Sequence, residues 1–119
     1  MKKTVLIVED DIDIQSYYEA LLSDMGLKLL KAYNGKEAFT IIDSEKNIDL
    51  IILDIVMPIM NGEEFLQELK LERKLNIPVI LSSVDEISTL RLTGIYNIEG
   101  IFYKLGDFKD LKELVLKNI

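Results

Sequence analysis

Residues 50–65 read LIILDIVMPIMNGEEF. Its first four residues are apolar without polar alternation, which is typical of a strand buried on both faces in a parallel sheet covered by helices. The run ends in Asp54, and a buried carboxylate costs several kcal/mol unless something compensates its charge. Pro58 and the Asn61-Gly62 pair then turn the chain into a segment that indicates a helix.

The same order of apolar run and amphipathic segment recurs along the whole chain. Apolar runs that indicate strands lie at 4–8, 27–32, 50–54, 78–82 and 100–104, and segments with helical spacing lie at 12–25, 36–44, 62–75, 85–96 and 107–118. Five such units predict one domain over residues 1–119, an α/β fold with a single five-stranded parallel sheet and helices on both faces. Gly26 is predicted to close the first helix, Asp107 to cap the last one, and Leu71 to face inward from the third.

Composition excludes several classes of function. Fourteen basic and twenty-one acidic residues give a net charge of −7, which argues against direct binding of nucleic acid or of an anionic membrane surface. The chain has no cysteine and no histidine, so it forms no disulfide and carries no histidine base, histidine metal ligand or phosphohistidine of its own. The apolar run near the N-terminus is too short for a signal peptide, and no run approaches transmembrane length. We expect a cytoplasmic protein.

Polar residues lie at the ends of four of the five predicted strands. They are Glu9, Asp10, Asp54, Ser82, Ser83 and Lys104. The carboxyl ends of parallel strands meet at one edge of a sheet, where ligands bind in such folds. We therefore expect these side chains to converge there.

Such a constellation suits phosphoryl transfer. Three close carboxylates raise each other's pKa unless a cation neutralises them, and a hard divalent ion such as magnesium does so with oxygen ligands. Lys104 supplies a positive charge that pairs with Asp54 and then with a phosphoryl oxygen. Ser83 and the backbone N–H groups of 55–58 add hydrogen bonds.

Each of these residues alone has an ordinary structural explanation. A strand-end aspartate such as Asp54 is more often a cap or turn residue, and Asp10 and Asp11 suit the start of a helix. Lys104 alone reads as a solvated lysine, and Ser83 as a strand-end hydroxyl. Their convergence on one sheet edge favours a functional site.

The stretches VLIVEDD (5–11), LIILDIVMPIMNG (50–62), IPVILSS (77–83) and YK (103–104) resemble the receiver domain of two-component response regulators. The resemblance covers essentially the whole chain. It implies a (βα)5 flavodoxin-like fold with strand order 2-1-3-4-5, and a signalling module that is not an enzyme beyond promoting its own phosphorylation and dephosphorylation.

The resemblance also implies roles for the strand-end residues. Asp54 would accept a phosphoryl group from a phosphohistidine of a partner kinase or phosphotransfer protein. Glu9 and Asp10 would hold Mg2+, with Mn2+ as a substitute, together with Asp54 and the backbone carbonyl of Val56. Lys104 would contact the phosphoryl group. Ser83 would be the switch hydroxyl, with Ser82 as the second choice.

Three departures from the family pattern bear on switching. Leu105 replaces the proline that usually follows the lysine, so the Lys104–Leu105 bond is either trans with a shifted loop or a cis bond that costs about 3–4 kcal/mol. Ile101 replaces the switch aromatic residue, while strand parity turns Phe102 to the other face. Asn97 stands where the family has glycine, after a short fourth helix that contains Gly94. We expect weaker or altered output switching.

Three other functions compete with this one, and the sequence argues against the last two. A degenerate receiver would keep the fold and bind partners without phosphorylation. A haloacid-dehalogenase-like phosphatase would need an acid at Val56, and a flavodoxin-like cofactor site would need a glycine loop where Glu9 and Asp10 stand. The output domain or target is unknown, and the family leaves a homodimer through the last two helices open.

Overall fold

Strands and helices alternate along the chain in the computed structural model, which describes residues 2–84, 86–104 and 106–119. The strands are β1 (Thr4–Val8), β2 (Lys28–Ala32), β3 (Leu50–Asp54), β4 (Val79–Ser83) and β5 (Gly100–Tyr103). They form one sheet in the order β2-β1-β3-β4-β5, and every pairing is parallel. The predicted fold class and strand order are confirmed, with strand ends displaced by one residue at most.

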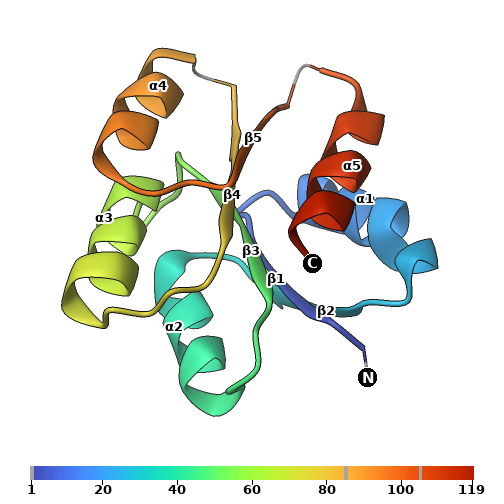
Figure 1. Ribbon diagram of the computed structural model, residues 1–119, viewed down its shortest axis with the longest axis horizontal. Coiled ribbons are helices and arrows are strands. Elements are labelled where there is room, and N and C mark those ends of the chain that lie inside the picture. The colour runs from blue at the N-terminus through green and yellow to red at the C-terminus, as the bar shows by residue number, and fades with distance from the viewer. Residues whose placement is uncertain (1, 85, 105) are drawn as a thin grey trace.

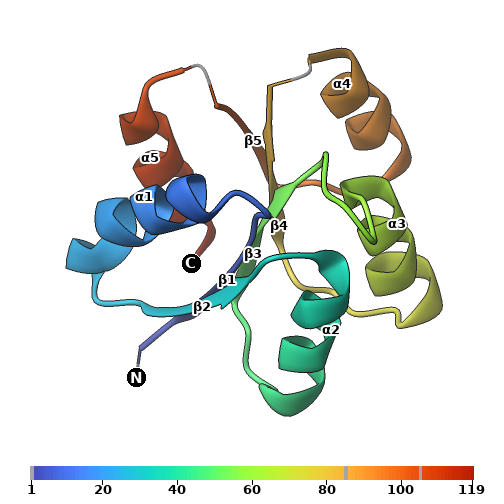
Figure 2. The same ribbon diagram turned by 180° about the vertical axis from the view of Figure 1, so that it is seen from behind.

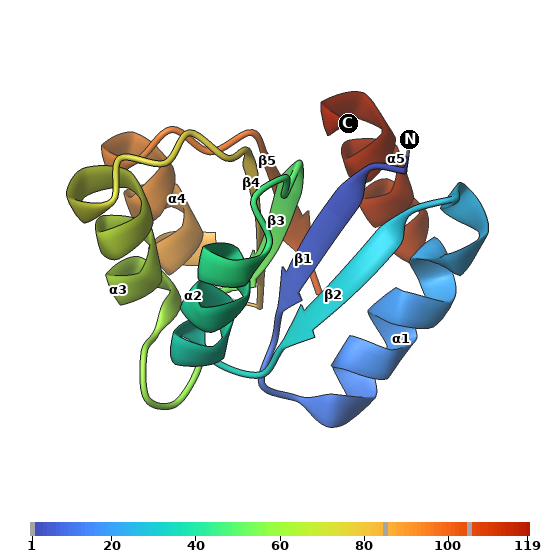
Figure 3. The ribbon, with the colours of Figure 1, turned by 90° about the horizontal axis from the view of Figure 1, so that it is seen from below.

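The helices cover both faces of this sheet, as predicted. They are α1 (Ile12–Leu22), α2 (Gly35–Ser44), α3 (Gly62–Leu66), α4 (Glu86–Ile95) and α5 (Phe108–Asn118), with the short helices η1 (Ser23–Met25) and η2 (Gln67–Glu72) after α1 and α3. Helices α1 and α5 lie on one face, and α2, α3 and α4 lie on the other (Figures 1 and 3). The Asp107 carboxylate caps α5 as predicted, by accepting a hydrogen bond from the backbone N–H of Lys109. Within the described ranges, no helix combines the length and apolarity needed to cross a membrane.

The third helix differs from the prediction of a regular helix over 62–75. Only its first part is α-helical, and η2 is wound as a π-helix in which Arg73 N–H donates to the Glu68 carbonyl at 2.8 Å. The wider turn changes which side chains face the sheet. Leu69 is fully buried, but Leu71 is 59% exposed, so its predicted inward position is wrong.

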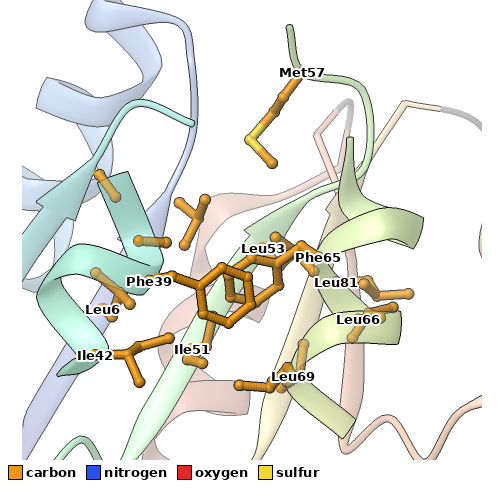
Figure 4. Packing of buried hydrophobic residues seen from close by; sticks show 14 of the residues in the cluster. Leu6, Phe39, Ile42, Ile51, Leu53, Met57, Phe65, Leu66, Leu69 and Leu81 are labelled. Atoms are coloured by element: carbon orange, nitrogen blue, oxygen red, sulfur yellow. The ribbon is translucent and has the colours of Figure 1, made fainter. Parts of the chain in front are cut away.

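Two apolar clusters hold the sheet between the helices, because successive strand residues point to opposite faces. Leu53 and Leu81 belong to the cluster under α2, α3 and α4, where the rings of Phe39 and Phe65 stack with centroids 4.6 Å apart (Figure 4). Ile52 belongs to the cluster under α1 and α5. Each buried side chain of this size contributes roughly 1.5–3 kcal/mol. The packing fixes the relative positions of the strand ends.

Gly26 closes the first helical segment as predicted, directly after η1. It adopts a left-handed conformation with φ of 67°, and an added Cβ would meet no heavy atom within 4 Å. We expect Gly26→Ala to lower the free energy of unfolding by about 1 kcal/mol through backbone strain alone, measured by urea denaturation.

The matched control is Gly94→Ala in α4, where an added Cβ also lies in open space. This change should raise the free energy of unfolding by roughly 0.5–1 kcal/mol, because alanine suits a helix better than glycine. Equal effects of the two substitutions would contradict the assignment of strain to Gly26.

Candidate functional site

The polar residues that the sequence analysis singled out lie at the carboxyl edge of the sheet. Glu9 follows β1, Asp54 ends β3, Ser83 ends β4 and Lys104 follows β5. The loop after β3, drawn in green, lies at the same end of the sheet as the ends of β4 and β5 (Figure 2). The parallel topology therefore brings together residues that are far apart in sequence.

Lys104 is the centre of this site. Its Nζ lies 2.7 Å from Glu9 Oε1 and 3.0 Å from Asp54 Oδ1. Glu9 is 1% exposed and Asp54 5%. The ammonium therefore compensates the charge at the end of the apolar strand, and it does so for two buried carboxylates at once. The sequence pointed to the pair with Asp54 but not to the shorter contact with Glu9.

Burial and charge shift the ionisation of all three groups. Burial raises the pKa of Glu9 to about 7, although the hydrogen bond from Lys104 opposes this shift. Burial also raises the pKa of Asp54 above its ordinary value, again against the attraction of Lys104. Burial alone would lower the pKa of Lys104, but its bonds to the two carboxylates raise it. The lysine is therefore charged, and the site resists holding two ionised acids.

Asp10 completes a cluster of three acids. One carboxylate oxygen from each of Glu9, Asp10 and Asp54 lies within 4.8 Å of the others. Asp10 is exposed. The neighbouring Asp11 has a different place, since its carboxylate accepts hydrogen bonds from the N–H groups of Asp13 and Ile14 and caps α1. Of this acidic pair, Asp11 therefore caps the helix, whereas Asp10 lies with Glu9 and Asp54.

The acid cluster has the donor set of a divalent-cation site. Three carboxylates supply oxygen ligands, which Mg2+ prefers. Against the single positive charge of Lys104, they leave two negative charges when fully ionised, which a divalent ion would balance. Val56, the expected source of a carbonyl ligand, lies in the loop after β3 with its side chain exposed.

The loop after β3 approaches the site closely at Gly62. Its N–H donates to the Ile55 carbonyl at 2.7 Å, and an added Cβ would lie 2.8 Å from the Asp54 carbonyl oxygen. In the same loop, the exposed Ile59 adopts a left-handed conformation with φ of 69°, which is strained for a β-branched residue. The loop therefore contains backbone strain at Ile59.

The two serines at the end of β4 have different surroundings. Ser83 is buried, and its carbonyl accepts a hydrogen bond from Lys104 N–H at 2.9 Å. The Ser82 hydroxyl lies 2.6 Å from the hydroxyl of Tyr18. Phe102 packs under α1 and α5, as strand parity predicted. The predicted alternatives for the Lys104–Leu105 bond lie outside the described residues, as does the predicted start of the fourth helix at residue 85.

Two residues near the site had no predicted role. Gln15 is fully buried, and its amide nitrogen donates to the carbonyls of Ile7, Glu9 and Ala32. These bonds tie the ends of β1 and β2 together. Tyr18 lies within the predicted helix over 12–25, and the sequence assigned it no role at the site. Spacings of three and four along α1 place Gln15 with Tyr18 and Leu22 on one face, which is a signal for the burial of Gln15 but not for its bonds.

Comparison with known proteins decides the family. The sequence model described as "Response regulator receiver domain" matches residues 5–116.

The chain belongs to the response regulator receiver domain family.

Curated and solved relatives agree with this receiver assignment. A probable transcriptional regulator, ycf29 of Porphyra purpurea, is 36% identical over all of this chain, which spans 57% of that protein. The response regulator TrrA of Thermotoga maritima, solved in complex with Mg2+-BeF, is 31% identical, with a TM-score of 0.86 and coverage of 98% of this chain and 99% of that one. Vibrio cholerae CheY4 shares the fold, with a TM-score of 0.88, 22% identity and full coverage of both chains.

The chain spans 57% or less of each of several curated relatives, among them two further transcriptional regulators. The match therefore concerns the receiver part of those longer proteins. The acidic pocket of Glu9, Asp10 and Asp54 fits the phosphoacceptor site of a two-component response regulator receiver.

The raised pKa of Glu9 gives this receiver a stability that depends on pH. Below about pH 4.5 Glu9 is protonated in both the folded and the unfolded chain, whereas between that pH and about 7 only the folded chain keeps the proton. Without divalent ions, the free energy of unfolding should therefore fall over this range, by on the order of 3 kcal/mol from Glu9. Asp54 shifts in the same direction.

The measurement is urea denaturation in EDTA at several pH values, with Glu9→Gln as the control. The glutamine does not titrate, so the variant should lose less stability than the wild type as the pH rises. Identical pH dependence of the two proteins would show that Glu9 ionises in the folded protein as it does in the unfolded chain.

Proposed function

We propose that residues 1–119 form one receiver module of a two-component phosphorelay, which takes a phosphoryl group onto Asp54 in a Mg2+-dependent reaction. One observation carries the proposal: a buried aspartate lies 3.0 Å from a lysine ammonium and within 4.8 Å of two further acids. A structural cap would need none of these partners. Receiver domains are typically signalling modules rather than enzymes that act on separate substrates.

The chemistry follows from these groups. An Asp54 carboxylate oxygen attacks phosphorus, an O–P bond forms, and the P–N bond to the donor imidazole breaks. The imidazole leaves with the electron pair and gains a proton from solvent. Lys104 Nζ neutralises charge on the phosphoryl oxygens, and the Ser83 hydroxyl donates a hydrogen bond to one of them. Mg2+ held by Glu9, Asp10, Asp54 and the Val56 carbonyl would supply further charge neutralisation and alignment.

The phosphoryl donor lies outside residues 1–119 under this proposal, because these residues include no histidine. A histidine kinase or a phosphotransfer protein fits this requirement. We include Mn2+ as a substitute for Mg2+, since both ions accept carboxylate and carbonyl oxygens, and a cytoplasmic location, with which a chain free of cysteine is compatible.

Acetyl phosphate tests the phosphoacceptor directly, because it can supply the phosphoryl group without a partner protein. With Mg2+, the wild type should gain the mass of one phosphoryl group, and Asp54→Asn should gain none, as intact-mass spectrometry would record. A wild type that stays unmodified would leave a receiver that binds partners without phosphorylation. Phosphorylation of the asparagine variant would place the acceptor elsewhere.

Substitutions of two adjacent exposed acids, Asp10 and Asp11, test the proposed cation site. Asp10→Asn removes a proposed ligand, so the Mg2+ dissociation constant should rise at least tenfold, and phosphorylation by acetyl phosphate should slow at limiting Mg2+. Asp11→Asn removes the same charge one residue along, and asparagine caps a helix about as well as aspartate. This control should bind Mg2+ nearly as the wild type does in a calorimetric titration. Equal losses of Mg2+ affinity in both variants would indicate that Asp10 acts through its charge alone and not as a ligand of the ion.

A further inference from the structure

A row of three neighbouring residues crosses the sheet and includes the proposed phosphoacceptor, Asp54. Ser82 on β4 is the register partner of Asp54 on β3 and of Phe102 on β5. Register partners in a parallel sheet face the same side, and Phe102 packs under α1 and α5. Asp54, Ser82 and Phe102 therefore point to the α1–α5 side. Ser82 is 1% exposed, so its hydroxyl needs a partner within the protein.

Tyr18 supplies that partner from α1. Its hydroxyl lies 2.6 Å from Ser82 Oγ, and its ring meets Phe102 edge-on with centroids 6.3 Å apart and Phe108 of α5 at 6.2 Å. Tyr18 belongs to the buried apolar cluster on this face. The hydroxyl pair is thus a directed polar contact beside this apolar cluster, and loss of either partner leaves the other unsatisfied.

The pair also adjoins the reacting groups. Burial raises the pKa of Tyr18 to about 12, and the charges of Lys104, Glu9 and Asp54 act on it as well. Tyr18 therefore remains a neutral hydroxyl at ordinary pH. Ser83 directly follows Ser82, and its carbonyl holds the backbone N–H of Lys104. A displacement of Ser82 would move the proposed switch hydroxyl and the backbone of the lysine together.

We propose that Tyr18 is a positioning residue for phosphoryl transfer: its hydroxyl fixes Ser82 and, through it, the alignment of Ser83 and Lys104 with Asp54. The inference rests on the proposed function. It assigns Tyr18 no contact with the phosphoryl group and no part in cation binding. Helices α1 and α5 lie side by side on this face (Figures 1 and 2), so the aromatic contact with Phe108 connects the same hydroxyl to α5.

The test compares Tyr18→Phe and Ser82→Ala with the wild type and with the double variant. Acetyl phosphate is the phosphoryl donor for the rate measurement, and Mg2+ is titrated to obtain its dissociation constant. Both are used at concentrations that do not perturb folding. Each single variant should lower the maximal phosphorylation rate by about tenfold, because small misplacements of reacting groups cost rate steeply. The Mg2+ dissociation constant should change by less than about twofold, since all proposed ligands remain. The double variant should be no slower than either single variant.

Tyr17→Phe is the matched control, since it removes the same atom from the adjacent residue, whose half-exposed ring packs at a tilt against Phe108. Its rate should equal that of the wild type. A wild-type phosphorylation rate in Tyr18→Phe would overturn the inference. So would a loss of rate that is accompanied by an equal loss of Mg2+ affinity. Fully additive losses of rate in the double variant would overturn it as well. If Tyr18→Phe does not fold, Ser82→Ala decides by the same criteria. A wild type that accepts no phosphoryl group would overturn the proposed function and this inference with it, whereas a phosphorylated wild type with a normal Tyr18→Phe rate would overturn the inference alone.

Discussion

The site depends on one partly buried cation placed between two buried carboxyl groups. The Lys104 ammonium lies 2.7 Å from Glu9 and 3.0 Å from Asp54, and it joins the ends of three strands that are not consecutive in sequence. Without it, two carboxylates would remain almost out of contact with water, where each ionised form is costly. The lysine thus makes an acid-lined edge compatible with a folded sheet.

This arrangement is not the most stable one available to the fold. The raised pKa of Glu9 indicates that folding disfavours its charged form, and the left-handed Ile59 adds backbone strain in the neighbouring loop. Such costs are typical of positions held for binding or chemistry. The apolar clusters on both faces offset these costs.

Much of this structure follows from local sequence patterns, and the exceptions have physical reasons. Apolar runs and strand-end positions sufficed to predict the sheet and the convergence of Asp54 with Lys104. The π-helical winding that exposes Leu71 was not predicted, because the apolar spacing of that segment also fits a regular helix. The contact between Tyr18 and Ser82 joins residues 64 positions apart, and no periodicity in sequence encodes such a pair. Asp10 and Asp11 look alike in sequence, and only the start of α1 separates their roles.

The division of the core into two clusters has a consequence for how such a domain diversifies. Side chains on opposite faces of the sheet meet through the backbone ladder rather than through one another, so substitutions under α2, α3 and α4 should combine additively with those under α1 and α5. The cluster on one face of the sheet can therefore accumulate substitutions while the cluster on the other face stays unchanged. A fold of this kind offers evolution two separately adjustable surfaces around one acidic site.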